Sequence, residues 1–163
     1  MTDTLLGIGS TGLVSVTEQL DEAPDLLRRL PPGGIAWVRG GEGFVAWGEV
    51  ARIDPGPGRD RFRRAWEVAA SLLESADMRN PVGVPGSGPV AFGSFTFDPD
   101  SPGSSVVIPA VVVGRAGGRA WVTRVGAGRI PNPAAAAGPP ASASPTPASE
   151  SVSTRVRPLV TST

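Results

Sequence analysis

Four residue types are missing from this chain of 163 residues: histidine, cysteine, lysine and tyrosine. Without histidine and cysteine there is no Ser-His or Cys-His nucleophile, no imidazole or thiolate metal ligand, and no disulfide. Without lysine there is no Schiff-base chemistry, and all 15 basic residues are arginines, which stay protonated and are poor general bases. Aspartate and glutamate are therefore the only side chains left for acid-base chemistry.

An excess of charge and a long apolar run are also missing. The 15 basic residues balance 15 acidic ones, so the net charge of zero predicts no attraction to nucleic acid or to an anionic membrane. No apolar run reaches 18 residues, and the start MTDTLLGIGSTGLVSV has no basic n-region, so the sequence predicts neither a membrane span nor a secretory signal. We expect a cytoplasmic protein with a single core, for which this length suffices.

The stretch at residues 81–115 carries the clearest strand pattern. Residues 90–97 alternate between two faces, whereas residues 106–113 are almost continuously apolar. This contrast predicts a half-buried strand beside a fully buried one. The intervening DPDSPGS at 98–104 is rich in turn-forming residues, so we expect a hairpin.

Further strands are predicted on both sides of this stretch. Residues 35–39 and 44–53 flank the glycine-rich GGEG at 40–43 and predict a hairpin. A turn at 114–118 precedes a strand at 119–125, where Trp121, Thr123 and Val125 share one face.

One amphipathic helix is predicted between PGPG at 55–58 and Asn80-Pro81, with Asp60 as its N-cap. A shorter helix at 19–30 is interrupted at Pro24. In the longer helix we expect one side to pack on the sheet and the other to face solvent. The packing side holds Phe62, Ala65, Trp66, Ala69, Leu72, Leu73 and Ala76, and the solvent side holds Arg61, Arg63, Arg64, Glu67, Glu74 and Asp77.

Three stretches resemble the N-terminal half of isochorismate synthases, which belong to the chorismate-utilising enzyme family and are related to anthranilate synthase component I. They are IAWVRGGEGFVAWGEVARID at 35–54, NPVGV at 80–84 and FGSFTFDPDSPGSSVVIPAVVVGR at 92–115, and the resemblance continues to Trp121 and Val125. The string LLES at 72–75 also matches a motif of anthranilate synthases, but there it lies in a strand and here in a helical pattern, so we treat it as coincidence.

The resemblance implies an α+β fold, namely the N-terminal half of a twisted β-sandwich with an amphipathic helix packed outside. Isochorismate synthases move a hydroxyl from C4 to C2 of chorismate, for menaquinone or siderophore biosynthesis. In that family a lysine activates water, a glutamate protonates the leaving hydroxyl, and Mg2+ holds substrate carboxylates. Those residues lie in the C-terminal half, so no catalytic, cofactor-binding or metal-binding residue is carried over to this sequence. The chain alone is expected to be inactive and to need no Mg2+ itself.

We expect three regions along the chain. Residues 1–19 form a flexible N-terminus, residues 20–126 form the partial enzyme domain, and residues 127–163 form a low-complexity linker or tail. The Pro, Ala and Ser content of the tail is typical of disordered or extended segments, because little apolar surface is available to offset the entropy of ordering.

Several weaker motifs allow other functions. GIGSTG at 7–12 fits a dinucleotide-binding turn, which needs a strand before it and a helix after it, but only six residues precede it and Val14 and Val16 follow, so a flexible or strand-initial start is favoured. Asp98 and Asp100 spell a D-x-D that could ligate Mg2+ or Ca2+, although turn formation is favoured. Arg39-Gly40-Gly41 is better explained as a hairpin turn than as an RNA-binding motif. The alternative to an enzyme fragment is a non-catalytic α+β binding or scaffold module.

The arginines near the start of the helix could also form a binding site. Arg61, Arg63 and Arg64 could together hold a phosphate group. Three arginines in the first turns of an amphipathic helix are more typical of a solvated face, which we favour.

Overall fold

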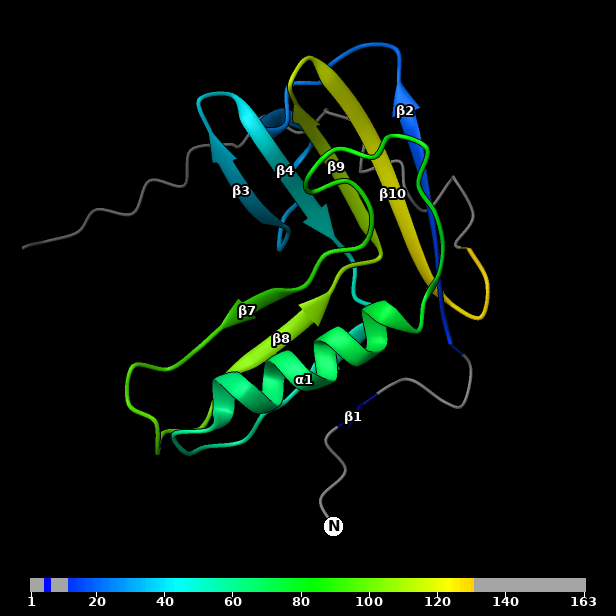
Figure 1. The fold of residues 1–163 in the computed structure, drawn as a ribbon. Helices are drawn as coiled ribbons and strands as arrows, with labels where there is room; N and C mark the ends of the chain where they lie inside the picture. The colour runs from blue at the N-terminus through cyan, green and yellow to red at the C-terminus, as the bar shows by residue number, and fades with distance from the viewer. Residues whose placement is uncertain (1–4, 7–11, 131–163) are drawn as a thin grey trace, which may run out of the picture.

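The structure, a computed structural model, describes residues 5–6 and 12–130. In this part of the chain the fold is mixed α and β, mostly sheet, with one α-helix, so the coarse class predicted from the sequence is confirmed. The strands form a six-stranded sheet in the order β3-β4-β9-β10-β2-β6 and a four-stranded sheet in the order β1-β5-β8-β7, in which β1 is Leu5–Leu6. Figure 1 shows the larger sheet above the smaller one, with α1 lying across the smaller sheet. No helix among the described residues has the length and apolar character needed to cross a membrane.

The six-stranded sheet is built around two long strands. β2 (Leu13–Leu20) and β10 (Arg119–Ala127) pair antiparallel over their whole length, and β10 also pairs with β9 (Val111–Ala116). β9 pairs in turn with β4 (Glu42–Trp47), and β4 with β3 (Ile35–Arg39). The last strand, β6 (Asp77–Arg79), runs parallel to β2 at the other edge.

The predicted hairpin at 35–53 is confirmed for its first turn. β3 and β4 are joined by Gly40 and Gly41, whose φ angles of 59° and 82° are both positive. Two positive φ angles are typical of the type I′ turn, which matches the twist of the flanking strands. The turn explanation of Arg39-Gly40-Gly41 therefore holds.

The chain passes from one sheet to the other twice, and the two crossings lie side by side. After β4 it enters β5 (Ala51–Ile53) through Gly48, and after β8 (Ser105–Ile108) it enters β9 through Pro109 and Ala110. Gly48 has a φ of 69°, and a Cβ there would lie 2.8 Å from Cβ of Ala110. The strands predicted as continuous over 44–53 and 106–113 are therefore each divided between two sheets.

The hairpin predicted around DPDSPGS is confirmed, with a shorter first strand. β7 (Phe92–Ser94) pairs antiparallel with β8, and Gly93 lies opposite Val106. β7 is the edge of the smaller sheet and is largely exposed, so the half-buried strand expected over 90–97 reduces to these three residues.

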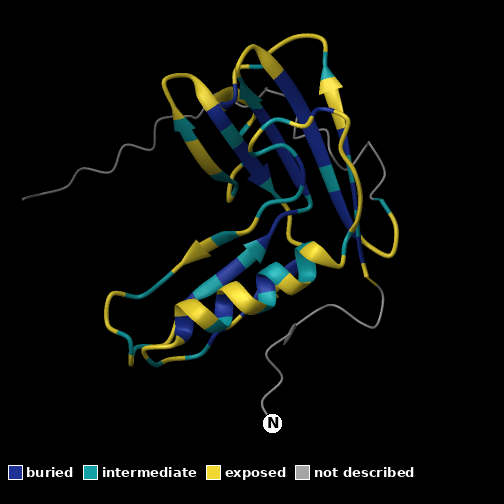
Figure 2. Ribbon diagram, viewed as in Figure 1, coloured by how far each residue is buried: buried dark blue, intermediate teal, exposed yellow. Residues whose placement is uncertain are grey.

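The helix α1 (Arg61–Glu74) packs on β5 and β8 through Ala65 and Ala69, which are buried with Ile53 and Val106. Figure 2 shows buried, intermediate and exposed positions along α1, and its predicted solvent and packing sides are partly exchanged. Arg61 is buried, whereas Phe62 and Trp66 are 52% and 75% exposed. Helical periodicity predicts which side of a helix is apolar. It does not determine which side chains at the margin of that side are buried.

The ends of α1 also differ in detail from the prediction. Asp60 holds the N-cap position, but its carboxylate makes no capping hydrogen bond and lies 3.4 Å from the guanidinium of Arg63. At the other end the helix stops at Glu74, and Asp77–Arg79 form β6. The helix is thus shorter than the expected span to Asn80-Pro81.

The beginning of the chain differs most from the prediction. Residues 13–20, which we expected to belong almost entirely to a flexible N-terminus, instead form β2. The short helix expected at 19–30 reduces to a single 3-10 turn (Leu27–Arg29), which Asp25 caps by accepting hydrogen bonds from the backbone N–H groups of Leu27 and Arg28. Most of GIGSTG, and the tail from residue 131, lie outside the described residues.

Candidate binding groove

A row of four residues crosses one face of the six-stranded sheet. Trp37, Phe44, Gly114 and Trp121 are direct partners on the adjacent strands β3, β4, β9 and β10. The indole of Trp121 occupies the space that a side chain at position 114 would need, because a Cβ on Gly114 would lie only 2.4 Å from Cζ2 of Trp121. The indole of Trp121 therefore lies over Gly114.

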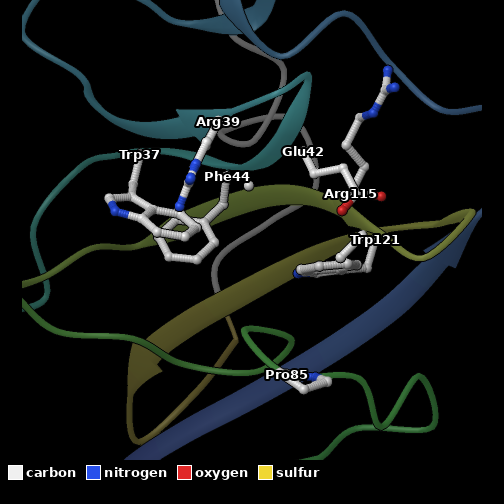
Figure 3. A pocket seen from close by; sticks show the side chains of 9 residues that line it. Trp37, Arg39, Glu42, Phe44, Pro85, Arg115 and Trp121 are labelled. Atoms are coloured by element: carbon white, nitrogen blue, oxygen red, sulfur yellow. The ribbon is translucent and has the colours of Figure 1, made fainter.

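The aromatic rings of this row continue towards the smaller sheet. The rings of Trp37 and Phe44 stack with 5.5 Å between centroids, and the edge of Phe44 meets Phe92 of β7 at 5.6 Å. Two hollows of about 230 and 440 Å³ share Trp37, Phe44 and Pro85 in their walls. We call this surface the aromatic groove, and it is lined chiefly by Trp37, Phe44, Pro85, Phe92 and Trp121 (Figure 3).

The loop that carries Pro85 is fixed in place by polar contacts. Oδ1 of Asn80 accepts hydrogen bonds from the backbone N–H groups of Val82 and Gly83, at 3.2 and 3.3 Å. Further along, the backbone N–H of Gly88 donates to the hydroxyl of Thr123 at 3.2 Å, and Arg119 donates to the carbonyl of Val82 at 2.8 Å. The wall of the groove is therefore anchored to β10.

Few polar groups reach the aromatic groove. Glu42 accepts a hydrogen bond from the backbone N–H of Gly117 at 2.9 Å, so this carboxylate already has a partner. Arg39 lies at the rim, and Figure 3 shows Arg115 extending away from the ring of Trp121. Trp121 is 1% exposed, and its Nε1–H has no hydrogen-bond partner among the described residues. The groove offers flat apolar surface with two arginines, Arg39 and Arg115, in its lining, which suits binding rather than acid-base catalysis.

The predicted D-x-D turn at Asp98 is confirmed. Oδ1 of Asp98 accepts from the backbone N–H of Asp100 at 3.0 Å, and Oδ2 accepts from the hydroxyl of Ser101 at 2.9 Å. These bonds, and more weakly the charge of Arg61, hold the pKa of the Asp98 carboxyl below its ordinary value. Among the described residues, no group of three or more His, Cys, Asp or Glu could hold a metal ion.

The arginine cluster of α1 is not one surface. Arg61 donates to the carbonyl of Thr96 at 3.0 Å, and Arg64 donates to the carbonyls of Pro55 and Pro57 at 2.8 and 2.6 Å. Arg63 pairs with Glu67 on the exposed side, which raises the pKa of its guanidinium. The expected solvated face is thus correct for Arg63 and wrong for Arg61, because the loops beside the helix supply carbonyl acceptors.

A third hollow, separate from the two in the aromatic groove, lies between α1 and β7. It has a volume of about 630 Å³, and we call it the α1–β7 groove. Its apolar lining includes Phe62 and Trp66 of the helix and Phe95 after β7, with the rings of Phe62 and Phe95 4.3 Å apart. The sequence placed the helical residues against the sheet, and the structure leaves part of that surface uncovered.

Comparisons with protein-family models, with curated proteins and with solved structures give no match to this chain.

Proposed function

We propose that this chain is the N-terminal, non-catalytic part of an isochorismate synthase, which isomerises chorismate to isochorismate in the cytoplasm. In this proposal the chain contributes half of a twisted β-sandwich. The lysine, the glutamates and the Mg2+ site belong to a C-terminal half that matches nothing in these residues. The isomerase activity would belong to the assembled enzyme.

One observation carries the proposal beyond the resemblance itself. Two of the resembling stretches, 35–54 and 92–115, pair with each other in both sheets. β4 pairs with β9 in the larger sheet, and β5 pairs with β8 in the smaller one. Stretches that share a sequence pattern thus form one contiguous structural unit rather than scattered pieces.

The uncovered apolar surface also supports a missing partner half. Phe62 and Trp66 stay exposed along the α1–β7 groove, and among the described strands β7 has no partner on its outer side. Open sheet edges and apolar grooves are ready sites for further chain, and natural proteins usually cover them. A C-terminal half that added a strand to β7 would cover both features.

A reconstitution experiment tests the proposal. We expect the chain alone, given chorismate and Mg2+, to form no isochorismate. Mixing it with the separately expressed C-terminal half of an isochorismate synthase should give a complex on gel filtration and restore isochorismate formation. Trp66→Glu should weaken that complex, whereas Arg28→Glu, at an exposed site in the 3-10 turn Leu27–Arg29, should not. Activity of the chain alone, or no complex at any concentration, would overturn the proposal.

The aromatic groove favours the second candidate, a non-catalytic α+β binding or scaffold module. Such a module needs no partner half to be stable. Cooperative two-state unfolding of the isolated chain, together with no complex in the reconstitution, would favour it. Aggregation of the isolated chain that Trp66→Glu relieves would favour the enzyme fragment.

A further inference from the structure

We propose that the aromatic groove binds a proline-rich segment of this same chain, residues 139–147 with the sequence PPASASPTP, in an extended polyproline II conformation. This inference does not depend on the isochorismate synthase proposal. It rests on the aromatic walls of the groove, on its chiefly apolar lining and on the length of chain that follows β10.

The walls of the groove suit proline rings. Trp37 is 60% exposed although it stacks on Phe44, so one face of a large ring is open to a ligand. Phe92 extends this aromatic surface into the second hollow. Grooves lined with aromatic rings bind polyproline II segments, whose preformed conformation lowers the entropy lost on binding.

The indole of Trp121 forms the floor of the groove. The ring lies over Gly114, the residue is 1% exposed, and its Nε1–H is buried below the surface. The floor therefore presents apolar surface and no polar group of Trp121 to an occupant. A polyproline II segment makes no internal hydrogen bonds and keeps its backbone solvated, so it can bind here through its proline rings.

The lining of the groove is chiefly apolar, which suits an uncharged occupant. Glu42 is bonded to Gly117, and the lining holds two arginines, Arg39 and Arg115, of which Arg115 extends away from the ring of Trp121 (Figure 3). A polyanion would be recognised by several cations together. Residues 139–147 carry no charge at all, and they contain four prolines in nine positions.

The length of the intervening chain is sufficient. Trp121 lies six residues before Ala127, the last residue of β10, which corresponds to about 20 Å of strand. An extended proline-rich segment covers about 3.1 Å per residue, so residues 131–138 span about 25 Å. The chain can therefore return along β10 and place residues 139–147 at the groove.

Spin labelling tests the proposal on the full chain. Because the sequence has no cysteine, Ser144→Cys introduces a single attachment site for a nitroxide. We expect the label to remove most of the indole N–H signal of Trp37 and Trp121 in nitrogen-15 spectra and to spare that of Trp66. Trp37→Ala should restore the Trp121 signal. Trp66→Ala, which removes another exposed tryptophan, should leave the loss unchanged.

A second variant tests the proposal without substituting any residue of the described fold. Replacing prolines 139, 140, 145 and 147 by serine changes only residues beyond the described fold, and it should also restore both indole signals. Full signals in the labelled wild-type chain, or equal losses at Trp66, would overturn the proposal. So would a loss seen only when a labelled chain is mixed with an isotopically labelled, nitroxide-free chain, because the occupant would then be a second copy.

Discussion

The hydroxyl groups of Thr17 and Thr123 lie 2.9 Å apart and are buried, although 106 residues separate them in the chain. Thr123 also accepts a hydrogen bond from the backbone N–H of Gly88. One hydroxyl therefore connects β2, β10 and the loop that walls the aromatic groove. Buried polar groups that lose a partner are costly, so this site is sensitive to substitution.

Thr123→Val should lower the free energy of unfolding by about 1 to 3 kcal/mol, because it leaves both Gly88 N–H and the Thr17 hydroxyl without a partner. Thr17→Val should cost less, since Thr123 keeps the bond from Gly88. Urea unfolding of both single variants and the double variant measures this, and the double variant should lose less than the sum. Ser71→Ala, on the exposed side of α1, is the control, and an equal loss there would contradict the assignment.

Gly114→Ala should destabilise the protein by about 1 to 3 kcal/mol, as expected when a methyl group is forced into a packed site. The added Cβ would lie 2.4 Å from Cζ2 of Trp121, so the indole must move. Gly12→Ala is the matched control, because nothing lies within 4 Å of its added Cβ. Thermal unfolding followed by tryptophan fluorescence measures both effects, and an unshifted spectrum for Gly114→Ala would contradict the proposed packing.

Arg61→Gln should reduce stability by about 1 to 3 kcal/mol, because the buried guanidinium donates to the carbonyls of Gly58 and Thr96. Arg63→Gln, two residues away, should change stability little, since its partners are exposed carboxylates. The comparison by urea unfolding separates the buried arginine from the solvated one. A larger loss for Arg63 than for Arg61 would reverse this assignment.

The Asp98 carboxyl should make stability depend on pH in the acid range. Its pKa in the folded protein is held below the ordinary 3.8, chiefly by the Asp100 N–H. The resulting stabilisation is fully present above that ordinary value and is lost as the pH falls through the lowered folded value. Asp98→Asn should thus be less stable than the wild type at pH 7, and the difference should shrink below pH 3.8. Ser101→Ala removes one donor and should reduce this pH dependence without abolishing it; unfolding at a series of pH values measures all three proteins.

Local turn chemistry was the most predictable part of the fold. The Gly40-Gly41 turn and the Asp98 turn follow from residues within four positions of each other. β2 was missed because its buried face carries Ser15 and Thr17, which read as polar surface in the sequence. Burial of Thr17 depends on the distant Thr123, whose hydroxyl is its hydrogen-bond partner.

The aromatic groove has no signal in any single stretch of the sequence. Trp37, Phe44 and Trp121 were each predicted to lie in strands, but they come together only because four strands adopt one register. A glycine at position 114 does not by itself predict a groove, because its role depends on the indole of Trp121 that lies over it. Burial of Arg61 was hidden for a similar reason, because one of its two carbonyl partners, Thr96, lies 35 positions away in the sequence.

Because β2 and β10 are far apart in the sequence, β2 must wait for its partner strand while the chain is synthesised. β2 leaves the ribosome early, but its main partner is complete only when Ala127 has been added. At ordinary rates of translation this interval lasts about 5 to 20 seconds. Throughout that time the nascent chain carries a strand with an open edge, which is the period in which a chaperone would protect it and a neighbouring ribosome's product could capture it.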